Sequence, residues 1–151
     1  MSKIYIVGPV GSGKTTMAKE LSKSCRIPFY ELDKVVYDDE NHHKRTPVQI
    51  EKMMLSILQQ KEWIVEDVGR EVFLPLLKEA DVVYYLDKNR FTLYKRCFGR
   101  WIKQWIGLEE GSYQPSFSMF LQQIHWIDKD FHNIEKKNRI QNHARRLVKL
   151  K

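Results

Sequence analysis

Residues 3–16, which read KIYIVGPVGSGKTT, decide the fold of this chain. The run from Lys3 to Val7 is mostly β-branched and aromatic and stops at a glycine, which predicts a buried strand. Residues 8–15 fit the pattern GxxxxGK followed by Ser or Thr, whose glycines let backbone N–H groups turn inward around phosphate oxygens. A helix that begins near Lys14 directs the positive end of its dipole at the same point. Together these elements predict a site for nucleotide phosphates; an ordinary glycine turn is the alternative.

The loop pattern also predicts roles for single residues. The ammonium group of Lys14 is expected to contact the β and γ phosphates, and the hydroxyl group of Thr15 is expected to hold Mg²⁺. We therefore predict ATP and Mg²⁺ as cofactors. The residues expected to bind them are Gly8, Pro9, Val10, Gly11, Ser12, Gly13, Lys14, Thr15 and Thr16.

Strands and helices alternate along the rest of the chain. Apolar runs predict further strands, and apolar residues at helical spacing predict the helices between them. This alternation predicts a single α/β domain over residues 1–151, with a parallel sheet and helices on both of its faces. The expected strands after the first are 29–32, 63–65, 82–86 and 147–150, and the expected helices are 14–24, 47–60, 71–79, 90–105 and 117–145.

Two of these helices have recognisable start signals. Thr46 can accept a hydrogen bond at the start of one helix, Pro47 suits its first position, and Gln49 can reach back to complete a capping box. Asn89 can cap the helix that follows the fourth strand. These residues predict where the two helices begin.

Acidic residues follow three of the predicted strands, at the edge where α/β sheets bind ligands. Glu66 and Asp67 end the third strand, and we expect them to hold the metal ion together with Thr15. Asp87 ends the next strand and is either a further candidate for the metal or a helix cap. Asp33 follows the second strand. Its carboxylate either accepts the proton of an acceptor hydroxyl group or is a cap at the protein surface.

Three arginines are candidates for contacts with anions. Arg70 follows the third strand and could anchor an anionic group of the acceptor, or lie exposed to solvent. Arg96 and Arg100 lie four residues apart on one predicted helix, so their guanidinium groups share a face and could clamp the transferring phosphate. A solvated helix face is the alternative for this pair. Together with Lys14 and Asp33, the pair forms the predicted catalytic set.

The net charge of +7 and the isoelectric point near 9.4 favour an anionic partner, either nucleotide phosphates or nucleic acid. Basic residues are dense in residues 136–151, where a solvated helix face is one interpretation and contact with phosphate is the other. The two cysteines, Cys25 and Cys97, lie in no metal-binding spacing. No leader sequence and no long apolar run is recognisable, so we expect a cytoplasmic protein that does not enter the membrane.

These motifs, in this order, resemble those of the bacterial DNA-topology-modulation protein family, a group of adenylate-kinase-like P-loop kinases. The resemblance rests on the glycine-rich loop, on residues 31–34 (ELDK), on residues 63–66 (WIVE), and on Leu86-Asp87 with the arginines of the following helix. It extends over nearly the whole chain, although the loop is its most specific part.

The resemblance implies a three-layer P-loop fold with a five-stranded sheet in the order 2-3-1-4-5. It also implies an acceptor-binding segment after the second strand and a mobile helical lid near residues 101–116. Related chains usually end the third strand in Asp-Gly, whereas this chain has Glu66-Asp67. Kinase-like chemistry is the function that the resemblance implies.

Two functions fit the sequence. The first is a small cytosolic kinase that transfers the γ-phosphate of ATP to a nucleotide or another small acceptor, and the loop and the arginines favour it. The second is a regulatory ATP-binding protein associated with nucleic acid, which the basic charge and the family's name permit. We recognise no helix-turn-helix, RNA-recognition motif or zinc module in the sequence that would support the second function.

Overall fold

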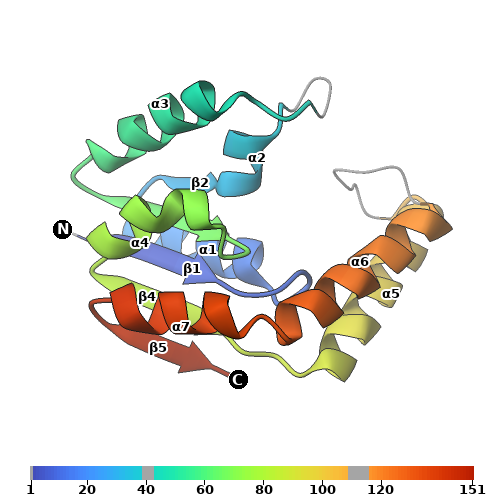
Figure 1. Ribbon diagram of the computed structural model, residues 1–151. Coiled ribbons are helices and arrows are strands. Elements are labelled where there is room, and N and C mark those ends of the chain that lie inside the picture. Colours follow the sequence, from blue (N-terminus) through green and yellow to red (C-terminus); the bar gives the residue numbers. More distant parts are fainter. Residues whose placement is uncertain (1, 39–42, 109–115) are drawn as a thin grey trace.

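The computed structural model describes residues 2–38, 43–108 and 116–151 and contains a parallel sheet of five strands (Figure 1). The strand order is β2-β3-β1-β4-β5, which confirms the predicted order. All four neighbouring pairs are parallel. The strands are β1 Lys3–Val7, β2 Phe29–Glu31, β3 Trp63–Asp67, β4 Val82–Leu86 and β5 Leu147–Leu150.

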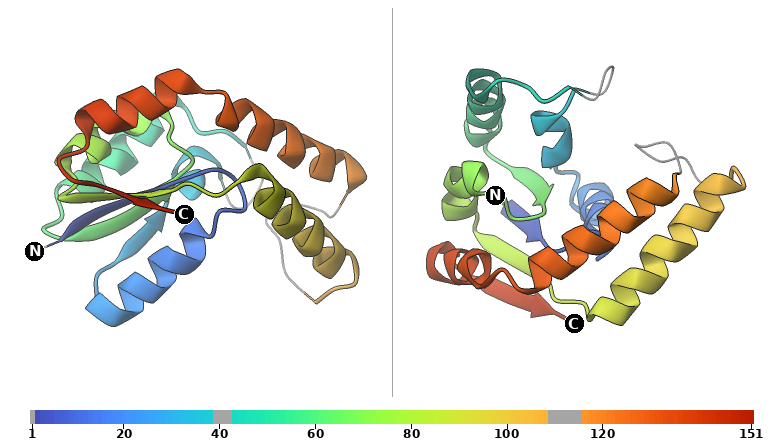
Figure 2. Two further views of the ribbon diagram at one scale, coloured as in Figure 1. Left: turned by 90° about the horizontal axis from the view of Figure 1, so that it is seen from below. Right: turned by 45° about the vertical axis from the view of Figure 1, so that its right-hand side comes forward.

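Helices cover both faces of the sheet and give the predicted three-layer arrangement (Figure 2). α1 packs on one face, and the buried side chains of α2, α3, α4 and α7 pack on the other. α5 and α6 lie side by side in a hairpin that projects beyond the sheet (Figure 1). The helices are α1 Lys14–Cys25, α2 Leu32–Val36, α3 Pro47–Leu58, the 3₁₀ helix η1 Glu71–Phe73, α4 Leu74–Glu79, α5 Arg90–Trp105, α6 Phe117–Phe131 and α7 Ile134–His143.

The central strand β1 shows why the first residues of the chain are apolar. Ile4 and Ile6 belong to the core beneath α1, whereas Tyr5 and Val7 belong to the core on the opposite face, and all four side chains are buried. A strand covered on both faces needs an almost continuous apolar run. Because β3 and β4 pair with β1 in parallel, the three strands end at the same edge of the sheet.

The predicted caps of two helices are present. Thr46 Oγ1 accepts a hydrogen bond from Gln49 N at 3.3 Å, and Gln49 Oε1 accepts one from Thr46 N at 2.9 Å, which completes the capping box of α3. Asn89 Oδ1 accepts a hydrogen bond from Thr92 N at 2.8 Å at the start of α5. Both helices therefore begin where the sequence predicts.

Two segments differ from the prediction. The helix expected over residues 117–145 is divided into α6 and α7 at Asn133, whose side-chain oxygen accepts a hydrogen bond from Lys136 N at 2.9 Å. A short polar side chain of this kind competes with the helical backbone and starts a new helix. The second strand ends at Glu31, so that Leu32 begins α2. The break before α7 lets the α5–α6 hairpin leave the sheet in its own direction (Figure 2).

Replacing Thr46 by Ala should lower the free energy of unfolding by about 1 kcal/mol, because Gln49 N loses its hydrogen-bond acceptor. Ser56→Ala is the matched control, since Ser56 is exposed within the same helix and its loss should cost less than about 0.5 kcal/mol. Urea denaturation followed by circular dichroism measures both variants. Equal stabilities of the two variants would contradict the assigned role of the cap.

Candidate active site

The loop between β1 and α1 has the backbone that its glycines predict. Gly11 and Gly13 have φ angles of +76° and +97°, a left-handed conformation in which residues with a side chain are strained. Gly8 is needed for space, because a Cβ atom there would lie 2.8 Å from Ser12 Oγ and 3.0 Å from the carbonyl oxygen of Leu86. The loop therefore packs tightly against the end of β4.

The buried polar groups of this loop fit a phosphate ligand. Lys14 is buried at the first position of α1, and its Nζ donates a hydrogen bond to the carbonyl oxygen of Pro9 at 3.0 Å. Burial lowers the pKa of Lys14, and the carboxylates of Glu66 and Asp33 oppose that effect. Ser12 Oγ is buried and has no hydrogen-bond partner in the described part of the chain. A buried hydroxyl group without a partner beside a lysine and a helix N-terminus is suited to phosphate oxygens.

Thr15 and Glu66 form the most direct link between the loop and β3. Thr15 Oγ1 donates a hydrogen bond to Glu66 Oε1 at 3.0 Å. Burial raises the pKa of the Glu66 carboxyl group, although Lys14 and the Thr15 hydroxyl group act in the opposite direction. The described residues contain no cluster of three or more His, Cys, Asp or Glu side chains that could hold a metal. Two oxygen ligands beside a phosphate site suit Mg²⁺, which completes its shell with waters and phosphate oxygens.

Asp67 is adjacent to Glu66 in sequence but has different partners. Its Oδ2 accepts hydrogen bonds from Gly69 N at 2.7 Å, from Arg70 N, and from the hydroxyl group of Tyr5 at 3.3 Å. Its Oδ1 accepts a hydrogen bond from the guanidinium group of Arg70. Burial and the charge of Asp67 raise the pKa of Tyr5 well above its ordinary value. The structure thus places Glu66 beside Thr15, and places Asp67 at the centre of the turn formed by residues 67–70.

Arg70 joins the ends of β2 and β3. Its guanidinium group bonds both Asp67 and the exposed carboxylate of Asp33, at the start of α2. Burial by itself would lower the pKa of Arg70, but the two carboxylates outweigh burial and raise it. The two residues predicted to bind the acceptor, Asp33 and Arg70, are therefore in direct contact, and Asp33 is close enough to influence the pKa of Lys14.

The predicted clamp contacts the loop through Arg96 of α5. Arg96 Nη1 donates hydrogen bonds to the carbonyl oxygens of Ser12 at 3.1 Å and of Gly11 at 3.4 Å. Arg100 lies one turn further along the helix, and its charge contributes to the lowered pKa of Lys14. Arg96 is thus in direct contact with the phosphate loop. Residues 109–115 of the predicted lid lie outside the described residues.

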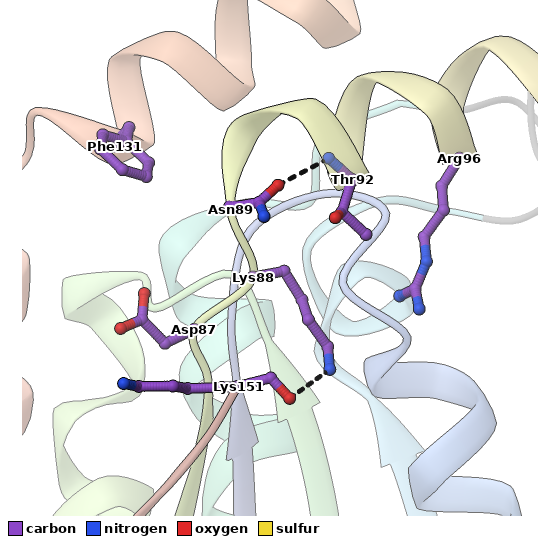
Figure 3. A pocket seen from close by; sticks show the side chains of 7 residues that line it. All are labelled: Asp87, Lys88, Asn89, Thr92, Arg96, Phe131 and Lys151. Carbon is purple, nitrogen blue, oxygen red and sulfur yellow. Dashed lines mark hydrogen bonds between the residues drawn. The ribbon is translucent and has the colours of Figure 1, made fainter.

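A cavity of about 450 Å³ lies beside the phosphate loop, at the ends of β4 and β5 (Figure 3). Lys88 Nζ donates a hydrogen bond to the carbonyl oxygen of Lys151 at its rim. Asp87 lines this cavity, whereas Glu66 contacts Thr15. The residues that line it are Asp87, Lys88, Asn89, Thr92, Arg96, Phe131 and Lys151.

Two basic residues of α7 contact the turn after β3, which the sequence did not predict. For Lys136 the sequence left open a solvated helix face or contact with phosphate, but its side chain is only 3% exposed, and burial lowers its pKa to about 7. Its Nζ donates a hydrogen bond to the carbonyl oxygen of Val68 at 2.7 Å, and Arg139 Nη2 donates one to Gly69 at 2.9 Å. The available signal was Ile140, a buried residue one turn after Lys136 on the same face of the helix.

The chain belongs to the AAA domain family, whose model matches residues 4–110. This region includes the phosphate loop, Asp33, Glu66 and Arg70. Among the described residues, no helix is both long and apolar enough to cross a membrane. The comparisons do not show the more specific resemblance to DNA-topology-modulation proteins, which stays a prediction.

Several similar proteins are kinases by name. The shikimate kinase of Aquifex aeolicus is 28% identical over 109 residues, which cover 63% of this chain and 65% of that enzyme. A structure of shikimate kinase from Acinetobacter baumannii in complex with shikimate has a TM-score of 0.57 and 16% identity, with 100% of this chain and 84% of that chain covered. A structure of deoxyadenosine kinase from M. mycoides with bound dATP has a TM-score of 0.58 and 14% identity. The match covers 100% of this chain and 91% of that chain. At these identities the two structures establish the fold.

Glu66→Gln should stabilise the ligand-free protein. The pKa of Glu66 in the folded protein lies above its ordinary value of 4.5, so the unfolded state loses this proton first as the pH rises. The free energy of unfolding of the wild type therefore decreases as the pH rises from the unfolded-state pKa to the folded-state pKa of Glu66. The variant lacks this decrease. Its advantage should appear above pH 4.5 and become constant above the folded-state pKa. Thermal unfolding at a series of pH values, without nucleotide, measures this difference.

Asp67→Asn provides the matched comparison, because it changes the neighbouring carboxylate. It should destabilise the protein by about 3 kcal/mol, since it removes the buried negative charge that pairs with the guanidinium group of Arg70. In calorimetric titrations with Mg–ATP, Glu66→Gln should be the variant with lower affinity. A loss of stability in both variants would contradict the assignment of different roles to the two carboxylates.

Proposed function

We propose that this protein is a kinase that transfers the γ-phosphoryl group of ATP to a small-molecule acceptor. One observation carries this proposal: the contact between Asp33 and Arg70 lies at the same sheet edge as the group formed by Lys14, Thr15 and Glu66. This arrangement would place a phosphate site next to a polar site for a second molecule. The kinase names of the similar proteins support the same class of reaction.

The phosphates of ATP would bind to the amide groups of residues 8–15 and to Lys14, and the Ser12 hydroxyl group would gain a partner. Thr15 and Glu66 would hold Mg²⁺, which neutralises charge on the β and γ phosphates when it is bound. Arg96 and Arg100 would face the phosphates from α5, where forked donors stabilise the charge that spreads over the phosphoryl oxygens.

Asp33 is the candidate for orienting the acceptor. Its carboxylate is exposed, while Arg70 fixes its position through a hydrogen bond. The acceptor oxygen would form a bond to the γ-phosphorus atom as the bond from that atom to the β–γ bridging oxygen breaks, which releases ADP. The proton of an acceptor hydroxyl group would pass to the Asp33 carboxylate. A hydroxyl acceptor suits this geometry, because a carboxylate attracts a hydroxyl group and repels an anion.

A coupled assay of ADP release tests the proposal with a defined panel. The panel contains shikimate and deoxyadenosine, after which similar kinases are named, together with nucleoside monophosphates, other nucleosides and small polyols. At least one acceptor should raise ATP turnover above the rate with ATP alone. Turnover that no member of the panel stimulates would count against a kinase of this class.

Lys14→Ala should lower acceptor-dependent turnover by about a hundredfold or more, because it removes the cation that contacts the transferring phosphate. Lys19→Ala is the control, since Lys19 is an exposed lysine further along the same helix. It should retain wild-type turnover in the same assay. Comparable losses in the two variants would contradict a specific role for Lys14.

Arg96→Ala and Arg100→Ala should each lower kcat by about tenfold or more and change the dissociation constant of ATP much less. The reason is that the charge they would stabilise develops in the transition state. Lys95→Ala removes an exposed cation from the same helix and serves as the control. Steady-state kinetics and calorimetry separate the two effects. A loss of ATP affinity equal to the loss of kcat would assign the arginines to ground-state binding.

The nucleic-acid hypothesis is not favoured by any described contact. Two basic residues of the C-terminal segment, Lys136 and Arg139, donate hydrogen bonds to backbone carbonyl groups inside the protein. The named similar proteins are kinases that act on small molecules. A gel shift with duplex DNA at low salt tests the hypothesis directly, because binding through phosphates is strongest there.

A further inference from the structure

The turn formed by residues 67–70 is held from two sides. On the inner side, the carboxylate of Asp67 accepts hydrogen bonds from the N–H groups of Gly69 and Arg70. On the outer side, α7 supplies two donors: Lys136 Nζ bonds the carbonyl oxygen of Val68, and Arg139 bonds that of Gly69. Four consecutive polar groups of the turn backbone therefore have partners, and two of these four depend on α7.

Lys136 also shapes the turn by its aliphatic stem. A Cβ atom at Gly69 would lie 2.8 Å from Lys136 Cδ and 3.2 Å from Cε, so the stem lies directly over the glycine. Gly69 has a φ angle of +94°, which favours glycine for a second reason. The backbone at Gly69 is thus confined between the sheet and a buried lysine side chain.

The ammonium group of Lys136 contacts a carboxylate of another helix. It forms a salt bridge with Asp130, near the end of α6, and both side chains are largely buried. Removing the charge of Asp130 would leave a cation whose burial is unfavourable, which makes the pair strongly interdependent. The salt bridge therefore connects the end of α6 to the turn at the end of β3.

α6 is in turn the partner of α5, which carries Arg96 and Arg100 (Figure 1). Tyr94 on α5 donates a hydrogen bond to Asp128 on α6, and Arg90 forms an ion pair with the same carboxylate at 3.6 Å. These contacts lie close to the Lys136–Asp130 pair in the sequence of α6. A series of polar contacts thus joins the base of the α5–α6 hairpin to the turn that carries Arg70.

We propose that Lys136 is a positioning residue that fixes the turn at residues 67–70 to the base of the α5–α6 hairpin. It acts through the backbone, because it bonds Val68 and covers Gly69, and the turn presents Arg70 to Asp33. Its role in acceptor binding rests on the proposed kinase function. Its role in holding the turn does not.

Hydrogen–deuterium exchange of the full chain tests the structural part without an acceptor. In Lys136→Met, which keeps an unbranched apolar side chain and removes the charge, the amides of Gly69 and Arg70 should exchange about tenfold faster or more. In Lys129→Met, which changes an exposed lysine of α6, they should exchange at the wild-type rate. Asp130→Asn should accelerate the same two amides, because it removes the partner of Lys136.

The amides of β1 report whether the variants remain folded. Wild-type protection in β1 with faster exchange at residues 69–70 is the expected pattern. Unchanged exchange at residues 69–70 in Lys136→Met would overturn the proposal. Equal acceleration in β1 and in the turn, in both Lys136→Met and Asp130→Asn, would also overturn it, because Lys136 would then stabilise the whole fold.

A kinetic measurement tests the functional part with whichever panel compound stimulates turnover. Lys136→Met should raise the KM of that acceptor by about fivefold or more and leave the KM of ATP within about twofold. Equal changes in both constants would contradict a role confined to the acceptor side. If no panel compound stimulates turnover, the kinase proposal fails by itself, while the exchange measurement still decides whether Lys136 holds the turn.

Discussion

The parallel register of β1 with β3 and β4 is the constraint on which the candidate site depends. Because Val7 pairs with both Asp67 and Tyr85, the loop after β1, the carboxylates of β3 and the start of α5 reach one edge of the sheet. This register brings Thr15 within hydrogen-bonding distance of Glu66, 51 residues away. A slip of one residue would turn every side chain of β3 to the opposite face and separate these groups.

The alternation of side chains along a strand explains why neighbouring carboxylates have different tasks. Successive residues of a strand point to opposite faces, so Glu66 faces the same side as Ile64 and α1, and Asp67 faces the side of Tyr5. One carboxylate is thereby directed to the phosphate loop and the other to the turn that carries Arg70. Two adjacent acidic residues thus contact different parts of the candidate site.

Several cations around the candidate site have hydrogen-bond or ion-pair partners inside the protein. Arg70 bonds two carboxylates, Arg96 bonds carbonyl groups of the phosphate loop, and Arg139 bonds Gly69. Lys136 is buried against Asp130 and Val68. Such contacts fix the positions of cations before a ligand arrives, which lowers the entropy that binding must overcome. A high net charge is thus compatible with a small-molecule site, without a nucleic-acid partner.

The sequence by itself determined the features that depend on local chemistry: the glycine-rich loop and the caps at Thr46 and Asn89. These follow from backbone conformation and short-range periodicity, which neighbouring residues specify. The strand order was predicted only through the family resemblance. Only the tertiary structure decided which carboxylate meets Thr15 and that Lys136 is buried. Spacing cannot reveal either fact, because both depend on strand register and on how α7 packs against a turn about seventy residues earlier in the chain, where long-range contacts override local preference.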